Sequence, residues 1–83
     1  MFTILAKDFG GRKFDRYFKS WDKARQEMDK DVEDCCAHLG GKVHTKRDYF
    51  NADKGFYVYE KVAKFPNGEN CTWALIDGYF EDE

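Results

Sequence analysis

SWDKARQEMDKDVEDCCAHLGG, residues Ser20 to Gly41, is the longest helical pattern in this sequence. Ser20 is a favourable N-cap, and Asp22 places a negative charge in the first turn, where the helix macrodipole favours it. Gly40 and Gly41 supply a left-handed stop at the other end. Apolar residues recur at a spacing of three and four and form one stripe: Trp21, Ala24, Met28, Val32, Cys35, Cys36 and Leu39. The pattern predicts one amphipathic helix over residues 21–39.

Strand-like runs lie on both sides of this helix. Two precede it and three follow it, at residues 2–8, 13–19, 42–50, 56–65 and 71–80. Gly10-Gly11 suits the tight turn of an antiparallel hairpin, and Pro66-Asn67-Gly68 suits a type I turn. The order ββαβββ predicts an α+β fold, in which one helix packs on an antiparallel sheet of about five strands in a two-layer sandwich. We expect residues 1–83 to form a single domain.

The apolar stripe predicts which residues form the core between the helix and the sheet. We expect helix residues Trp21, Met28, Val32, Cys36 and Leu39 to pack on Ile4, Phe18, Val58, Trp73 and Leu75. One helix covers only part of a five-stranded sheet, so aromatic side chains on the other face should be exposed. An exposed apolar patch of this kind usually marks an interface. We expect a monomer or a weak homodimer.

Length and composition fit a soluble domain. The 83 residues are 42% hydrophobic and 36% charged, and the mean hydropathy is -0.81, which argues against insertion into a membrane. The N-terminal residues lack a signal-peptide pattern, and no apolar run approaches the roughly 20 residues that cross a bilayer. The chain has three cysteines, an odd number, and two of them are adjacent and poorly placed to pair. We therefore expect reduced thiols and a cytoplasmic location.

The chain contains residue types that can act in catalysis or bind metals, but their positions argue against a catalytic site and against a metal site. Ser20 is the only serine, and its capping role explains it. Cys35 and Cys36 lie near a helix C-terminus, where the dipole disfavours a reactive thiolate. The cysteines and histidines lack the Cys-x-x-Cys spacing of a zinc site. We expect no enzymatic activity, no metal and no cofactor.

Acidic residues gather on the predicted helix and at the C-terminal end. The net charge is only -2, but Lys64 is the last basic residue of the chain. Clustered carboxylates can imitate a phosphate backbone and occupy a basic groove on a protein partner. The candidate acidic surface comprises Glu27, Asp29, Asp31, Glu33, Asp34, Asp77, Glu81 and Asp82. The alternative interpretation is a solvated helix face.

A basic strand gives a second candidate surface. Single-stranded nucleic acids are bound by basic groups that contact phosphates and by sheet aromatics that stack on bases. Residues of both kinds occur at Lys42, His44, Lys46, Arg47, Tyr57 and Tyr59. The alternative interpretation is an edge strand that its lysines keep soluble.

In overall plan the chain resembles the small anti-CRISPR-type inhibitors that phages carry against host defence. The likeness lies in a free-standing domain without an enzyme motif, an acidic helix at Trp21 to Leu39 and an acidic C-terminal end. It covers organisation over the whole length and no motif, so it transfers no functional residue. It implies a stoichiometric inhibitor that engages a nucleic-acid-handling host or defence protein.

Overall fold

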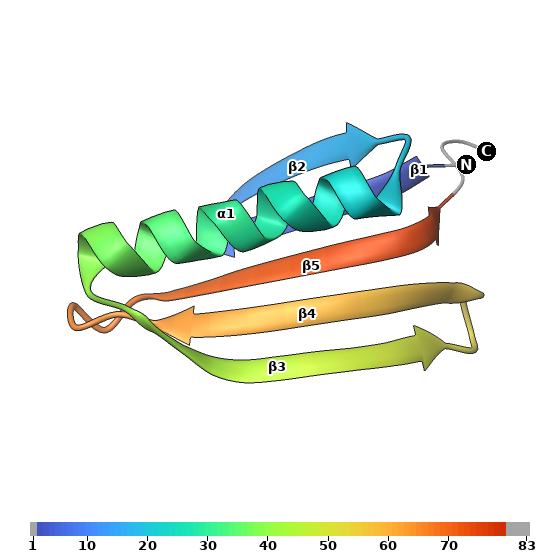
Figure 1. The fold of residues 1–83 in the computed structure, drawn as a ribbon. Helices are drawn as coiled ribbons and strands as arrows, with labels where there is room; N and C mark the ends of the chain where they lie inside the picture. Colours follow the sequence, from blue (N-terminus) through green and yellow to red (C-terminus); the bar gives the residue numbers. More distant parts are fainter. Residues whose placement is uncertain (1, 80–83) are drawn as a thin grey trace.

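The computed structural model describes residues 2–79, which contain one helix and five strands (Figure 1). The elements are β1 (Phe2–Phe9), β2 (Arg12–Phe18), α1 (Trp21–Leu39), β3 (Lys42–Asn51), β4 (Phe56–Lys64) and β5 (Asn70–Tyr79). Their bounds lie within one residue of those predicted from the sequence. The α+β class and the order ββαβββ are confirmed.

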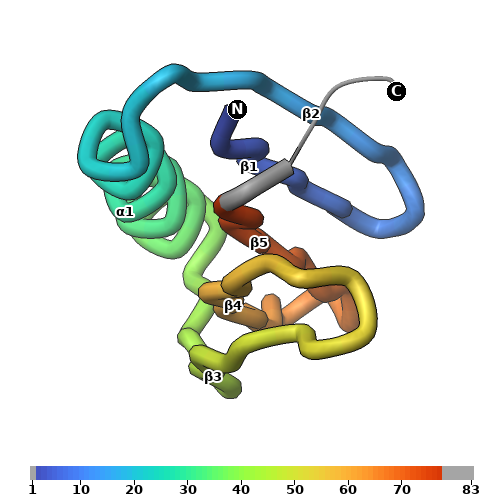
Figure 2. Tube along the Cα trace, turned by 90° about the vertical axis from the view of Figure 1, so that its right-hand side faces the viewer, coloured from blue at the N-terminus to red at the C-terminus, as the bar shows by residue number. Residues whose placement is uncertain are grey.

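The five strands form one antiparallel sheet in the order β2-β1-β5-β4-β3. The hairpin β1–β2 and the meander β3–β4–β5 follow the chain, and pairing of β1 with β5 joins them. Helix α1 lies across β1, β2 and β5 on one face and reaches β4 through its side chains, whereas β3 extends beyond it (Figures 1 and 2). The two edges of the sheet, β2 and β3, are therefore unequally covered.

The ends of α1 are set by the residues that the sequence indicates. The Ser20 hydroxyl accepts a hydrogen bond from the Lys23 N–H at 3.3 Å, as an N-cap does. Gly40 adopts a left-handed φ of 72°, and the Gly41 N–H donates to the carbonyl oxygen of Cys36 at 3.1 Å. A Cβ at Gly41 would collide with the ring of Phe65. The double glycine thus ends the helix and also lets the chain pass closely by the end of β4.

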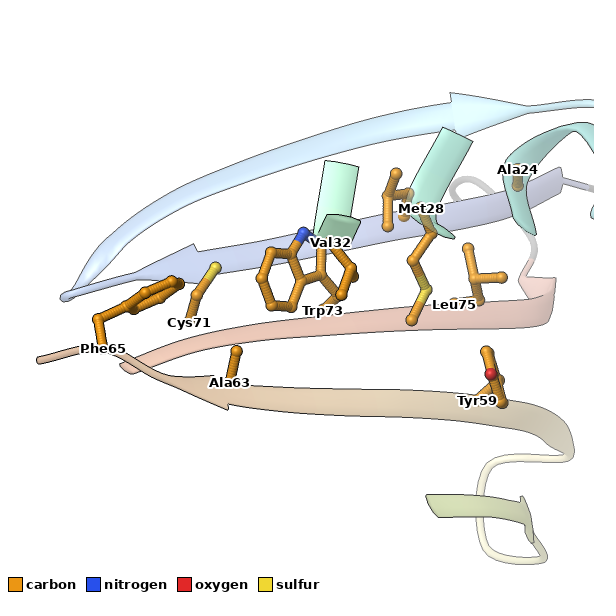
Figure 3. Packing of buried hydrophobic residues seen from close by; sticks show 10 residues of the cluster. Ala24, Met28, Val32, Tyr59, Ala63, Phe65, Cys71, Trp73 and Leu75 are labelled. Carbon is orange, nitrogen blue, oxygen red and sulfur yellow. The ribbon is translucent and has the colours of Figure 1, made fainter. Parts of the chain in front are cut away.

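The core lies between α1 and the middle of the sheet (Figure 3). Trp73, Leu75 and Cys71 of β5 are fully buried, as are Ala24 and Met28 of the helix. The buried cluster consists of Leu5, Ala24, Met28, Val32, Tyr59, Ala63, Phe65, Cys71, Trp73 and Leu75. The predicted core positions Met28, Val32, Trp73 and Leu75 are confirmed, and Trp21, Phe18 and Cys36 pack at its margin.

The predicted core is wrong at Ile4, Val58 and Leu39. Ile4 and Val58 are buried, but both pair with Ile76 on the face turned away from α1, while their neighbours Leu5 and Tyr59 face the helix. Side chains alternate along a strand, so an error of one position moves a residue to the opposite face. Leu39 continues the apolar stripe into the last helical turn, where 47% of its surface remains exposed.

The face away from α1 is less exposed at its centre than predicted. Ile4, Ile76 and Val58 form an apolar row across neighbouring strands, and Ile4 and Val58 are buried. Aromatic exposure is found at the two ends of this row, at Tyr17 on β2 and Tyr49 on β3.

Val32→Asp should abolish cooperative thermal unfolding. An unpaired carboxylate in the core costs about 3–5 kcal/mol, against a total stability of about 5–15 kcal/mol for a small domain. The matched control is Gln26→Asp, which adds the same charge at an exposed position of the same helix and should shift the transition only slightly. Circular dichroism melting measures both. An unchanged transition in Val32→Asp would contradict the packing of α1 on the sheet.

Candidate functional site

Two acidic residues of the candidate surface pair with cations beside them. Glu27 lies 3.3 Å from the guanidinium of Arg16 on β2, and Asp29 lies 3.1 Å from the ammonium of Lys61 on β4. Glu27 also pairs with Lys23 one helical turn away. The Arg16 hydrogen bond is the largest of the effects that hold the pKa of Glu27 below its ordinary value. These two carboxylates are therefore compensated within the domain.

Asp31 lies where α1 meets the sheet. One of its oxygens is 2.7 Å from the Lys7 ammonium and also accepts a hydrogen bond from the indole N–H of Trp73 at 2.8 Å. Figure 3 shows the Trp73 nitrogen turned toward α1. Partial burial alone would raise the pKa of Asp31, but hydrogen bonds from Lys7 and Trp73 outweigh it and lower the pKa. Asp31 is thus a structural link as well as a surface acid.

The position of Asp31 in the sequence indicates its contact with the sheet, which the interpretation of Asp31 as a surface acid missed. Asp31 stands three residues after Met28 and four before Cys35, on the helical stripe that faces the sheet. A carboxylate at such a position needs a cation or a donor opposite it. Lys7, on the helix-facing side of β1, and the Trp73 indole meet that need.

The other acidic candidates differ in exposure. Glu33 and Asp34 are exposed, and no side-chain hydrogen bond or ion pair reaches either carboxylate within residues 2–79. Asp77 is half-buried and accepts a hydrogen bond from the Thr3 hydroxyl at 3.2 Å. Glu81 and Asp82 lie outside the described residues. In the described part of the chain, the candidate acidic surface therefore narrows to Glu33 and Asp34.

The basic candidates share β3, but they do not share a face. Lys46 is opposite Lys61 and faces the helix side, whereas Arg47 is opposite Glu60 on the other side and pairs with it at 3.0 Å. Lys42 and His44 are exposed near the start of β3, where a register shift between Val43 and Thr45 interrupts the pairing with β4. The strand thus spreads its cations over both faces of the sheet.

The two tyrosines of the basic candidate surface are engaged inside the domain. Tyr59 is only 3% exposed, and the guanidinium of Arg25 lies 4.4 Å from its ring centroid. Tyr57 packs edge-on against Trp21 and donates a hydrogen bond to Asp48. Because Tyr59 is buried and the Tyr57 ring already contacts Trp21, the six basic and aromatic residues do not form one stacking surface.

The three cysteines are free thiols. Burial raises the pKa of Cys71 to about 12 and also raises the pKa of Cys35, so both are protonated at neutral pH. Lys7 lies 3.7 Å from the Cys35 sulfur without reversing this shift. Among the described residues, no group of three His, Cys, Asp or Glu side chains is placed to hold a metal ion.

A hollow of about 230 Å³ lies beside the Lys7–Asp31 pair, lined by Leu5, Lys7, Phe14, Arg16 and Asp31. Its charged side chains already pair, Lys7 with Asp31 and Arg16 with Glu27. A charged ligand would have to compete with these ion pairs, so the hollow is a weaker candidate than the exposed carboxylates.

No protein-family model matches the chain, and searches of curated proteins and of solved structures find no significant match. The likeness to anti-CRISPR inhibitors therefore stays a prediction. Within residues 2–79, the helix does not have the combination of length and apolar composition needed to cross a membrane.

Asp31→Asn should destabilise the protein by about 1–2 kcal/mol at pH 7, since it removes a charge-assisted interaction and leaves Lys7 without its counter-ion. The lowered pKa of Asp31 means that its contribution is present above the ordinary carboxyl range and is lost as the pH falls through the lowered value. The difference between the two proteins in urea unfolding should therefore shrink in acid.

Asp34→Asn is the matched control for this change. It makes the same substitution at an exposed position of the same helix and should leave stability nearly unchanged at both pH values. An equal loss of stability in both variants would show that net charge, and not the link from Asp31 to the sheet, is responsible.

Proposed function

We propose that this protein is a stoichiometric inhibitor that binds a nucleic-acid-handling protein partner through carboxylates on the outer face of α1. The observation that carries the proposal is the division of the helix acids. Glu27, Asp29 and Asp31 are compensated by cations of the domain, whereas Glu33 and Asp34 are exposed and uncompensated in the described chain. Those two charges are available to a basic partner.

The fold supports this role because it presents Glu33 and Asp34 on a rigid element. Val32, next to Glu33, is buried in the core, so the helix cannot turn its outer face away without unpacking. The last turn is held by a hydrogen bond between His38 Nδ1 and the carbonyl oxygen of Asp34 at 2.8 Å. Pre-positioned charges favour fast, selective association with a basic groove.

The mechanism requires no chemistry from the inhibitor. A domain of 83 residues that occupies a phosphate-binding groove blocks the nucleic acid by exclusion. Complementary charge would mainly increase the association rate. Such binding should weaken as the salt concentration rises.

Glu33→Lys/Asp34→Lys should eliminate the binding of a basic partner. The experiment uses the full chain as bait in bacterial lysate, with bound proteins identified by mass spectrometry. Wild type should recover a nucleic-acid-binding protein in near-stoichiometric amount, and the double variant should lose it because both contacts become repulsive.

Asp15→Lys/Asp53→Lys is the control with the same change in net charge. Both residues are exposed: Asp15 is opposite Ala6 on the face of the sheet away from α1, and Asp53 is in the β3–β4 turn. This variant should keep the partner. Equal loss in the two double variants would contradict a specific role for α1. Failure to recover any partner, together with turnover of a small molecule or tight binding of RNA, would contradict the proposed function.

A further inference from the structure

β3 is an edge strand, and no described strand pairs with its outer side. In the sheet it lies beside β4, at the end of the strand order. Among the described elements, β4 is the one with which it makes substantial contacts (Figure 2). An edge of this kind leaves backbone N–H and C=O groups without strand partners. Three large apolar side chains on β3 are also exposed: Val43, Tyr49 and Phe50. Another strand can pair with this edge.

We propose that β3 pairs with β3 of a second copy of this chain to form a two-fold dimer. Antiparallel pairing about Arg47 would join the two five-stranded sheets into one continuous sheet. This places Lys46 opposite Asp48 of the second copy, and two-fold symmetry repeats the pair. Both side chains lie on the helix side of the sheet, opposite Lys61 and Tyr59 of β4. A two-fold contact requires such self-complementarity.

The charges select this register over its neighbours. Sliding one strand by two residues would put Lys46 against Lys46 or Asp48 against Asp48, and like charges directly opposite are unfavourable. A slip of one residue would pair side chains from the helix-covered face of one copy with side chains from the face away from α1 of the other. At the symmetry axis the two Arg47 side chains meet, but each lies 3.0 Å from Glu60 of its own chain.

The same geometry limits the length of the ladder. The register shift between Val43 and Thr45 reverses the alternation of side chains there. Continuous pairing therefore runs from Thr45 to Tyr49 in each copy, with these two residues opposite each other on the face away from α1. A ladder this short gives a weak dimer. The inference does not depend on the proposed function, because it needs no other partner.

The opposite edge offers a rival contact that an experiment can distinguish. β2 carries Lys13 and Asp15 at the same spacing as Lys46 and Asp48. However, α1 contacts β2, and Arg16 of β2 reaches across to Glu27 on the helix. Within residues 2–79, the edge at β3 has substantial contacts with β4 alone.

The test measures self-association of the full chain by sedimentation equilibrium up to about 500 µM, a range that detects weak dimers. Wild type should dimerise reversibly. Lys46→Asp and Asp48→Lys should each weaken the dimer by about tenfold or more, since both cross-strand pairs become repulsive. The swap Lys46→Asp/Asp48→Lys should recover affinity to within about threefold of wild type, because it restores opposite charges.

Lys13→Asp and Asp15→Lys on β2 are the matched controls and should leave the dimer unchanged. Asp48→Lys also removes the acceptor of the Tyr57 hydroxyl, so Lys46→Asp, which touches no such bond in the described residues, is the cleaner single variant. A monomer at every concentration, a swap that fails to recover affinity, or dissociation by the β2 variants would overturn the proposal.

Discussion

The hydrogen bond from Trp73 to Asp31 fixes α1 on the sheet. The indole is fully buried at the centre of β5, and its N–H would lose a hydrogen bond without the carboxylate 2.8 Å away. Asp31 in turn needs the Lys7 ammonium at 2.7 Å, because a half-buried carboxylate is costly without a cation. Met28 and Val32 belong to the same buried cluster as Trp73. One polar link within an apolar interface thus sets both the position and the rotation of the helix.

This placement decides which charges the molecule shows to its surroundings. Once Asp31 faces Lys7, Glu27 and Asp29 lie along the flanks of the helix, within reach of Arg16 and Lys61. Glu33 and Asp34 face outward, and no cation of the described residues pairs with them. A net charge of -2 therefore conceals a strong division between compensated and available carboxylates. It is this division, and not the acidic composition, that makes the outer face of α1 a candidate binding surface.

Because the domain has one helix over five strands, the sheet is unequally covered. α1 contacts β1, β2 and β5, and the edge strand β3 extends beyond it. Charged residues and a register shift are devices that protect an edge from uncontrolled pairing, and β3 has both in Lys46, Asp48 and the interruption near His44. Because these charges are opposite in sign and two residues apart, they restrict pairing to one register and need not prevent it.

The sequence by itself determined the elements, because their signals are local. Ser20 caps the helix, Gly40 ends it, and alternation and turns mark the strands within one residue. It could not show that β1 pairs with β5, a contact that brings Thr3 and Asp77 together across 74 positions. It also left apolar residues on both sides of β1 and β4, so only the packing of α1 decided that Leu5 faces the helix and Ile4 does not. The roles of the acids depend on the same packing, since a carboxylate is compensated or available according to which cation the folded sheet brings beside it.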